Sequence, residues 1–253
     1  MANIITTSTV NGKQTDLFTQ FRDVWWDINS KVRPLQQVDS LCLEYIKNVL
    51  WEKGLVKEGG GFQLIKELLI LDVGCGGGIL TEPLARAGSK IIGIDINNSA
   101  IQAAEEHAKL DPNLRNLSYR WESIEDHCAE NVEKYDVVIL NLVLHHSKNH
   151  EVLVENCAKV LKPGGLVFMS ATGKTYEAWF RSIILGEYVL GYFVRGNFDW
   201  NSFINSSDVE ELMNKHGCNV EGIRGICYQI YSSHWKWTDN TNGLYIMHGT
   251  KAT

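Results

Sequence analysis

The sequence predicts an α/β fold in which helices cover both faces of a mainly parallel sheet. Short apolar and β-branched runs alternate with helical stretches from residue 64 to residue 165, which is typical of consecutive β-α-β units. A glycine cluster at residues 74–78 follows the first of these runs, as expected where a strand turns into a helix. At 253 residues, the chain is long enough for one large domain with its own core.

The alternation predicts each element in turn. We expect strands at residues 68–73, 90–95, 117–121, 135–140 and 166–170, with helices at 80–87, 99–110 and 152–161 between them. Apolar residues at helical spacing precede this core, at 15–51, and a helix at 206–216 and closing strands at 218–248 follow it. The predicted organisation is a single domain with a helical cap (1–61), a core (62–175), an amphipathic aromatic arm (176–205) and a C-terminal part (206–253).

Composition and charge exclude several classes of protein. The net charge is −6 and no run of Lys or Arg occurs, which argues against nucleic acid as a partner. The six cysteines show no C-x-x-C spacing, so neither a zinc site nor a disulfide framework is expected. No apolar stretch reaches about 18 residues, the length that a membrane-spanning helix needs. Residues 1–13 predict neither a secretory signal nor an ordinary mitochondrial presequence.

The glycine cluster predicts a ligand-binding turn. Glycine lets a ligand approach the backbone at the carboxyl end of a strand, where open parallel sheets bind their ligands. Asp95 ends the next strand, and a carboxylate there accepts hydrogen bonds from both hydroxyls of a ribose. Ile79 stands where the G-x-G-x-x-G spacing of dinucleotide folds has its third glycine, so a nucleoside without a pyrophosphate is favoured. A tight strand-to-helix turn with no ligand is the other explanation.

Two motifs resemble those of a known enzyme class. Asp72, Gly74, Gly76 and Gly78 form an acid-x-Gly-x-Gly-x-Gly pattern that resembles the first motif of class I S-adenosylmethionine-dependent methyltransferases. The Leu-Lys-Pro-Gly-Gly sequence at 161–165 resembles their late turn. This resemblance implies a Rossmann-like fold with a seven-stranded, mainly parallel sheet, and S-adenosyl-L-methionine as the cofactor.

The flanks of the core resemble a narrower family. Residues 21–27 (Phe-Arg-Asp-Val-Trp-Trp-Asp), 33–35 and 43–46 resemble the N-terminal helices of the ubiquinone-biosynthesis O-methyltransferases, both the bacterial type and its mitochondrial counterpart. The resemblance continues through Gly196 and Asp199 to the Trp-rich segment at 234–237. It implies methylation of a ring hydroxyl on a polyprenylated catechol or demethylubiquinol precursor, at the matrix face of the mitochondrial inner membrane.

The same resemblance implies the site residues. Cofactor contacts are expected at Asp72, Gly74, Gly76, Gly78, Asp95, Glu122, Ser123 and Asn141, with the adenine near the segment 122–124. The chain departs from the family pattern at Cys42, where an Arg is expected, and at Phe198, where a His is expected. A Glu-x-x-Glu-His metal cluster is expected at 142–146, but Leu142 and His145 replace its two acids. We therefore expect no metal, and an activity that is weak or absent.

Two neighbouring histidines are the candidate catalytic residues. A catechol oxygen attacks a methyl group well only as a phenolate, and a neutral imidazole of His146 or His145 can take the proton that a metal would otherwise help to release. The other explanation is structural: one ring bonded to a backbone carbonyl and the other solvated.

The aromatic arm at residues 176–194 predicts a contact with membrane or with a membrane-protein assembly. Its apolar and aromatic side chains outnumber its charges, and an enzyme acting on a polyprenyl substrate gains from an interfacial helix. Ordinary packing against the sheet is the alternative for about half of them. Two other functions stay open: a catalytically inactive structural subunit of a membrane-associated mitochondrial (respiratory-chain) assembly, and a methyltransferase acting on an unrelated soluble molecule.

Overall fold

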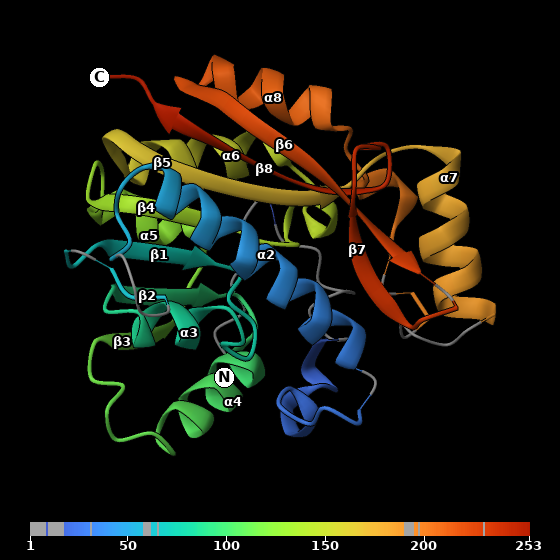
Figure 1. Cartoon of the computed structure of the whole chain (residues 1–253), viewed down its shortest axis with the longest axis horizontal. Helices are drawn as coiled ribbons and strands as arrows, with labels where there is room; N and C mark the ends of the chain where they lie inside the picture. The colour runs from blue at the N-terminus through green and yellow to red at the C-terminus, as the bar shows by residue number, and fades with distance from the viewer. Residues whose placement is uncertain are drawn as a thin grey trace.

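A computed structural model describes residues 9, 18–30, 32–57, 62–64, 66–189, 195–196, 198–229 and 231–253, without the side chains of 181, 185 and 189. Its centre is an eight-stranded sheet in the order β3-β2-β1-β4-β5-β8-β6-β7 (Figure 1). The strands are β1 Leu69–Val73, β2 Lys90–Asp95, β3 Leu117–Trp121, β4 Tyr135–Leu140, β5 Leu161–Thr172, β6 Cys218–Gln229, β7 His234–Thr238 and β8 Leu244–Lys251. Strands β1 to β5 pair in parallel, whereas β8 runs antiparallel to both β5 and β6.

The sheet has one strand more than the seven expected. The additional strand is β7, which pairs antiparallel with the end of β6 from Gln229↔His234 to Gly225↔Thr238. It forms because Trp235 and Trp237 alternate with polar residues, the pattern of a strand with one covered face, and both tryptophans pack on the core below α2. The sequence analysis placed this segment among the closing strands without separating it from β6.

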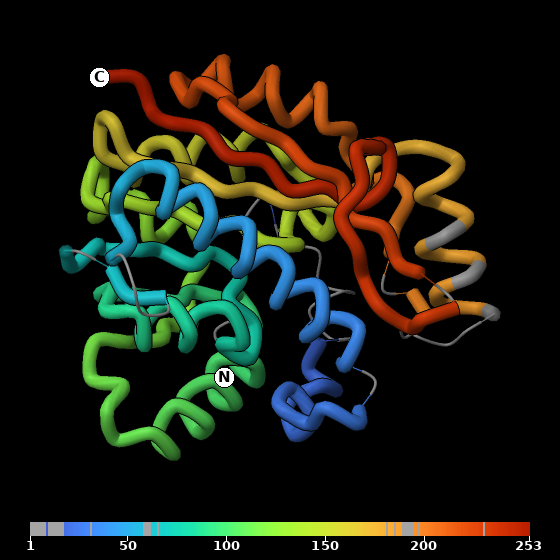
Figure 2. Tube along the Cα trace, viewed as in Figure 1, coloured from blue at the N-terminus to red at the C-terminus, as the bar shows by residue number. Residues whose placement is uncertain are grey.

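Helices cover both faces of the sheet, as predicted. Buried side chains of α2 Arg33–Glu52 and α3 Thr81–Arg86 share one core cluster, and those of α5 Ile124–Glu130, α6 His150–Val160 and α8 Ser206–Lys215 share another. Helix α4 Asn98–Ala108 packs beside β2 and β3. In the tube view, α2 crosses the near side of the sheet and α8 lies beside β6 and β8 (Figure 2). None of the described helices is both long and apolar enough to span a membrane.

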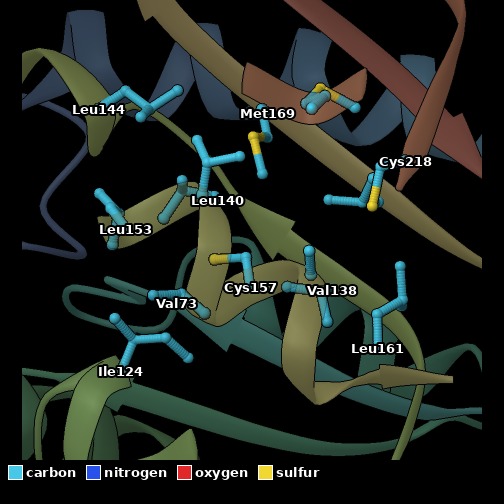
Figure 3. Packing of buried hydrophobic residues seen from close by; sticks show 14 of the residues in the cluster. Val73, Ile124, Val138, Leu140, Leu144, Leu153, Cys157, Leu161, Met169 and Cys218 are labelled. Carbon is cyan, nitrogen blue, oxygen red and sulfur yellow. The ribbon is translucent and has the colours of Figure 1, made fainter. Parts of the chain in front are cut away.

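The larger core cluster lies between the parallel strands and the second set of helices. Val138 and Leu140 of β4 point toward Leu153 and Cys157 of α6, with Met169 of β5 beside them (Figure 3). All five side chains are buried. Because this layer is dry and close-packed, it fixes the carboxyl ends of β1 and β4, where polar residues of the site begin.

The cap closes over those strand ends. A short helical turn, η1 Arg22–Val24, packs against α4, and α2 begins with Pro34 in its first turn. Trp26 donates from Nε1 to the carbonyl oxygen of Gly77 at 2.9 Å, and its ring stacks on that of His107 with 3.5 Å between centroids. The cap is thereby fastened directly to the glycine cluster. Most of residues 1–17, and the glycines at 59–61, lie outside the described residues.

The arm follows β5. It consists of α7 Tyr176–Trp179 and a wider π-helical segment, η3 Phe180–Val189. Residues 190–194, the end of the predicted amphipathic segment, lie outside the described residues. Among the described side chains, Tyr176, Phe180 and Tyr188 are 84%, 48% and 56% exposed, so they do not belong to the core.

Candidate functional site

A cavity of about 460 Å³ opens at the carboxyl ends of β1, β2 and β4 and extends beneath the cap and the arm. This is the switch point of the sheet order, where open α/β sheets bind ligands, and the volume is in the range of small-molecule sites. Among the predicted site residues, the lining includes Asp72, Gly74, Gly76, Asp95, Glu122, Asn141, His145 and His146. The structure therefore brings most of the predicted site to one cavity.

Gly78 and Ser123 are placed elsewhere. Neither is among the described residues that line the cavity. A Cβ at Gly78, where φ is +83°, would stand 2.2 Å from the hydroxyl oxygen of Tyr119, so this glycine makes room for a neighbouring side chain rather than for a ligand. Ser123 is buried as the N-cap of α5, where its Oγ accepts from the backbone N–H of Asp126 at 3.1 Å.

Asp95 is oriented by the backbone of the glycine cluster. Its Oδ2 accepts from the N–H of Gly76 at 2.9 Å, and its Oδ1 accepts from the N–H of Asn97 at 2.8 Å. Burial raises the pKa of Asp95, while these backbone hydrogen bonds act in the opposite direction. The backbone holds both carboxylate oxygens in place, and the carboxylate has further lone pairs with which to accept from a ligand hydroxyl. This is the geometry that a ribose requires.

Asp72 has a structural partner. Its Oδ2 accepts from the hydroxyl of Thr81, the first residue of α3, at 2.6 Å. Burial raises the pKa of Asp72 to about 7, with the Thr81 hydrogen bond lowering it and the charge of Asp95 raising it. Asp72 therefore ties the start of α3 to the end of β1, and it also faces the cavity.

Glu122 belongs to a buried hydrogen-bonded chain that the sequence analysis did not foresee. Its Oε1 lies 2.7 Å from Nδ1 of His127, and Nε2 of the same ring lies 2.6 Å from the hydroxyl oxygen of Tyr135. Burial lowers the pKa of His127, with Glu122 opposing that shift. The chain holds Glu122 in one orientation at the edge of the cavity.

A second chain joins the cap to the parallel strands. Asn141, directly after β4, donates from Nδ2 to Oδ1 of Asp39 at 2.7 Å and accepts at Oδ1 from the hydroxyl of Ser170 at 2.7 Å. Asp39 is buried, and burial together with the charge of Asp72 raises its pKa to about 8. The sequence analysis missed Asp39. The one available signal was an acid on the apolar face of α2, three residues before Cys42 and seven before Ile46.

His145 and His146 face the cavity side by side, with 4.3 Å between ring centroids and Phe198 packed against both. Burial lowers the pKa of His146 to about 4, and burial together with the neighbouring histidines lowers the pKa of His145 well below its usual value. Among the described residues, none forms a hydrogen bond with Nδ1 of either ring. The structural explanation, with one ring on a carbonyl and the other solvated, does not describe this pair. Both rings are neutral near pH 7 and keep an unused nitrogen.

Comparison with known proteins identifies the family. A family model described as "Methyltransferase domain" matches residues 71–169. A mitochondrial ubiquinone biosynthesis O-methyltransferase from Rattus norvegicus is 34% identical over 98% of this chain and 71% of its own length. A ubiquinone biosynthesis O-methyltransferase from Proteus mirabilis is 31% identical over 96% of this chain and 94% of its own.

The chain belongs to the ubiquinone biosynthesis O-methyltransferase family. Its fold is that of S-adenosylmethionine-dependent methyltransferases. A magnesium protoporphyrin IX methyltransferase from Synechocystis with bound S-adenosylhomocysteine is a solved structure with a TM-score of 0.64, 18% identity, and coverage of 94% of this chain and 96% of that one. At 18% identity, this similarity supports the fold and not the substrate.

The end of β4 is where the chain departs from the pattern that the family resemblance implies. Leu142 adopts φ +59°, and its N–H donates to Oγ of Ser170 at 2.7 Å. This left-handed conformation is costly for leucine, so the surrounding contacts hold the turn in place. No cluster of three His, Cys, Asp or Glu side chains suited to a metal ion occurs in the described part of the chain. Leucine offers no ligand atom, and the donor set at 142–146 therefore does not fit a hard cation.

Proposed function

We propose that the protein transfers a methyl group from S-adenosyl-L-methionine to a ring hydroxyl of a polyprenylated catechol or demethylubiquinol precursor. The observation that carries the proposal is the single cavity that joins the ribose-type carboxylate Asp95 to the neutral pair His145 and His146. The relatives named as ubiquinone biosynthesis O-methyltransferases support the choice of reaction.

The residues present fit the cofactor. Asp95 offers two oriented acceptors to a ribose, and Gly74 and Gly76 keep the backbone open beside it. Glu122 and Ile124 line the cavity beyond Asp95, on the side where the adenine is expected. When bound, the cofactor supplies an electrophilic methyl group on a sulfonium. The acidic lining favours this positive charge.

The histidine pair supplies the base. A ring hydroxyl that attacked the methyl group would lose its proton, and the imidazole of His146 or His145 would accept it. Their lowered pKa values keep both rings unprotonated and able to accept it at neutral pH. Phe198 packs against both rings and limits the access of water to them. No step in this scheme needs a metal.

The rest of the cavity suits an apolar substrate. Phe18, Phe21, Leu142 and Val143 line it, as do Ala178 and Gly186 of the arm. The ring of Phe18 lies 5.2 Å from that of His146, centroid to centroid. We propose that the exposed aromatics of the arm lie at the surface of a membrane, so that a polyprenyl tail stays in lipid while its ring enters the cavity. The mitochondrial relatives support a mitochondrial location, and we propose the matrix face of the inner membrane.

The test is product identity. The protein is incubated with methyl-labelled cofactor and a short-tailed demethylubiquinol analogue, or with a tailless soluble catechol, and mass spectrometry locates the label. The proposal predicts label on a ring oxygen and a higher kcat/KM for the tailed analogue. Equal or better turnover of the soluble catechol would favour a soluble substrate. Full cofactor binding without any product would favour the inactive structural subunit, for which the described residues offer no specific observation.

A further inference from the structure

Asp39 is a buried acid that bonds to Asn141 and also faces the cavity. It comes from α2, it is 8% exposed, and it lines the cavity. Its Oδ1 accepts from Asn141 Nδ2 at 2.7 Å, and no other described residue donates to Oδ2. Oδ2 is not among the fully buried polar atoms that lack a partner, so it is open to the cavity and can accept a hydrogen bond from a ligand.

A relay of hydrogen bonds fixes the direction of this acid. The N–H of Leu142 donates to Oγ of Ser170, so the hydroxyl proton of Ser170 is free to go to Oδ1 of Asn141. This sets the amide orientation of Asn141, and its Nδ2 then has to face Asp39. Asp39 is the last group of the relay and can only accept there. Its second oxygen is left for a donor that arrives from the cavity.

The charge of the lining says which kind of donor is missing. Six acids line the cavity: Asp39, Asp72, Asp95, Glu122, Glu125 and Glu177. None of the described lining residues is a Lys or an Arg. Cys42, on the turn of α2 that follows Asp39, stands where the family resemblance implies an Arg, and it is fully buried as a neutral thiol. A cationic ligand would neutralise negative charge of the lining acids that no Lys or Arg of the described lining balances.

The sheet order places this acid at the far end of the ligand path. Asp95 ends β2, Asp72 lies in β1, and Asn141 with its partner Asp39 lies at the end of β4. Because the order is β2-β1-β4, these acids form a row about 10 Å long, at roughly 4.8 Å for each strand spacing. A nucleoside that binds Asp95 by its ribose and extends across β1 brings its other end to Asp39.

We propose that Asp39 binds the α-ammonium group of the methionine moiety of S-adenosylmethionine, an inference that rests on the proposed function. The ammonium donates to Oδ2 of Asp39, while the Asn141–Ser170 relay holds Oδ1. Burial raises the pKa of Asp39 to about 8, and Asp72 and the Cys42 thiol are the other titratable groups close to it. A bound cation favours the ionised form, so the acid becomes a charged partner only when the ligand is present.

The test compares two ligands that differ at the amino-acid end. Calorimetry measures the Kd of S-adenosylhomocysteine, which has the ammonium group, and of 5′-methylthioadenosine, which lacks the whole amino-acid moiety. The isosteric variant Asp39→Asn keeps an acceptor for Asn141 but loses the negative charge. We expect its Kd for S-adenosylhomocysteine to rise about tenfold or more, the scale of a hydrogen bond to a charged group, and its Kd for 5′-methylthioadenosine to change less than about twofold. In the matched variant Asp95→Asn, both ligands should weaken together.

The outcomes separate this inference from the proposed function. If Asp39→Asn changes both Kd values equally, or neither, the inference is wrong while cofactor binding stands. If the wild-type protein binds neither ligand, the proposed function fails, and the inference with it. A second measurement needs no variant: wild-type protein should bind S-adenosylhomocysteine about tenfold more tightly than the analogue without its amino group. Equal affinity for these two would also overturn the inference.

Discussion

At the scale of single residues, burial decides which side chains of the site carry charge. Asp39 and Asp72 have raised pKa values and hold protons that exposed acids would release, whereas His145 and His146 have lowered pKa values and release protons that exposed imidazoles would keep. Near pH 7 and without a ligand, these four side chains therefore carry less charge than they would in water. The two imidazoles of the site can accept a proton, and its two acids can ionise when a cation binds beside them.

The raised pKa of Asp39, about 8, predicts a pH-dependent stability. Between about pH 4 and pH 8 the folded protein keeps a proton that the unfolded chain has released, so raising the pH through this window destabilises the fold. The variant Asp39→Asn has no proton to lose at this position, so it is not destabilised in this way as the pH rises. Relative to wild type, its unfolding free energy should rise with pH from 5 to 8, by up to about 1.4 kcal/mol per pH unit. Urea denaturation at each pH, without ligand, measures the difference.

The control for that measurement is Asp136→Asn. Burial raises the pKa of Asp136, but its hydrogen bonds with Lys162 and Leu69 hold the net value below the usual one, so this acid is ionised throughout the window. Its effect on the unfolding free energy should not vary from pH 5 to 8. A pH-independent difference for Asp39→Asn as well would mean that Asp39 is ionised in the ligand-free protein.

The histidine pair is predicted to act in chemistry and not in cofactor binding. The double variant His145→Gln with His146→Gln should lose about 10²- to 10⁴-fold in methyl-transfer rate, the usual contribution of a general base. Its affinity for S-adenosylhomocysteine should change less than about twofold, because the ribose carboxylate stays in place. The matched variant His234→Gln, at an exposed ring on β7, should keep full rate. Loss of affinity in parallel with rate would assign the pair a structural role instead.

At the scale of elements, the sequence pattern predicted those strands whose burial can be recognised from their own residues. The strands β2, β3 and β4 lie where the apolar runs placed them, because a buried parallel strand is readable from its own residues. Helix α5 was missed because seven residues are too few to show a helical period. Strand β5 is longer than expected because its pairing begins at Leu161, in a segment that reads as a turn by itself.

The arm is the element whose role the sequence could suggest only in part. The prediction is that its exposed aromatics bind lipid: Tyr176→Asp with Phe180→Asp should reduce flotation with vesicles of phosphatidylcholine and cardiolipin. Two aspartates cannot be inserted at the interface without large desolvation. The matched double variant Leu110→Asp with Val132→Asp changes side chains that are just as exposed, after α4 and after α5. If both double variants float like wild type, the arm does not bind this membrane.

At the scale of the whole molecule, the site is assembled across long sequence distances. Asp95 and the glycine cluster were predictable from the sequence. Asp95 ends β2, the glycine cluster follows β1, and these two strands are neighbours in the sheet. Asp39 was not predictable, since it reaches Asn141 across 102 positions and from the cap. The strained Leu142 and the packing of Phe198 on the two imidazoles likewise depend on tertiary contacts that no local pattern records.

The topology also explains why binding and chemistry depend on different parts of the chain. The proposed ribose site lies at β1 and β2, where Trp26 of the cap bonds to Gly77, whereas the histidines lie after β4 beneath the arm. The replacement of the acids expected at 142 and 145 leaves the proposed ribose site unchanged. The fold can thus keep its cofactor site while the means of activating the ring hydroxyl differs.

The central claim is that this site performs methyl transfer with imidazole in place of a metal. The most direct measurement is the initial rate of label transfer from S-adenosylmethionine to a short-tailed demethylubiquinol analogue, by wild-type protein with and without a chelator. We predict methylation of the ring oxygen at the same rate in both, because the donor set at residues 142–146 offers no acid to a cation. Turnover that the chelator abolishes and added magnesium restores would contradict the account.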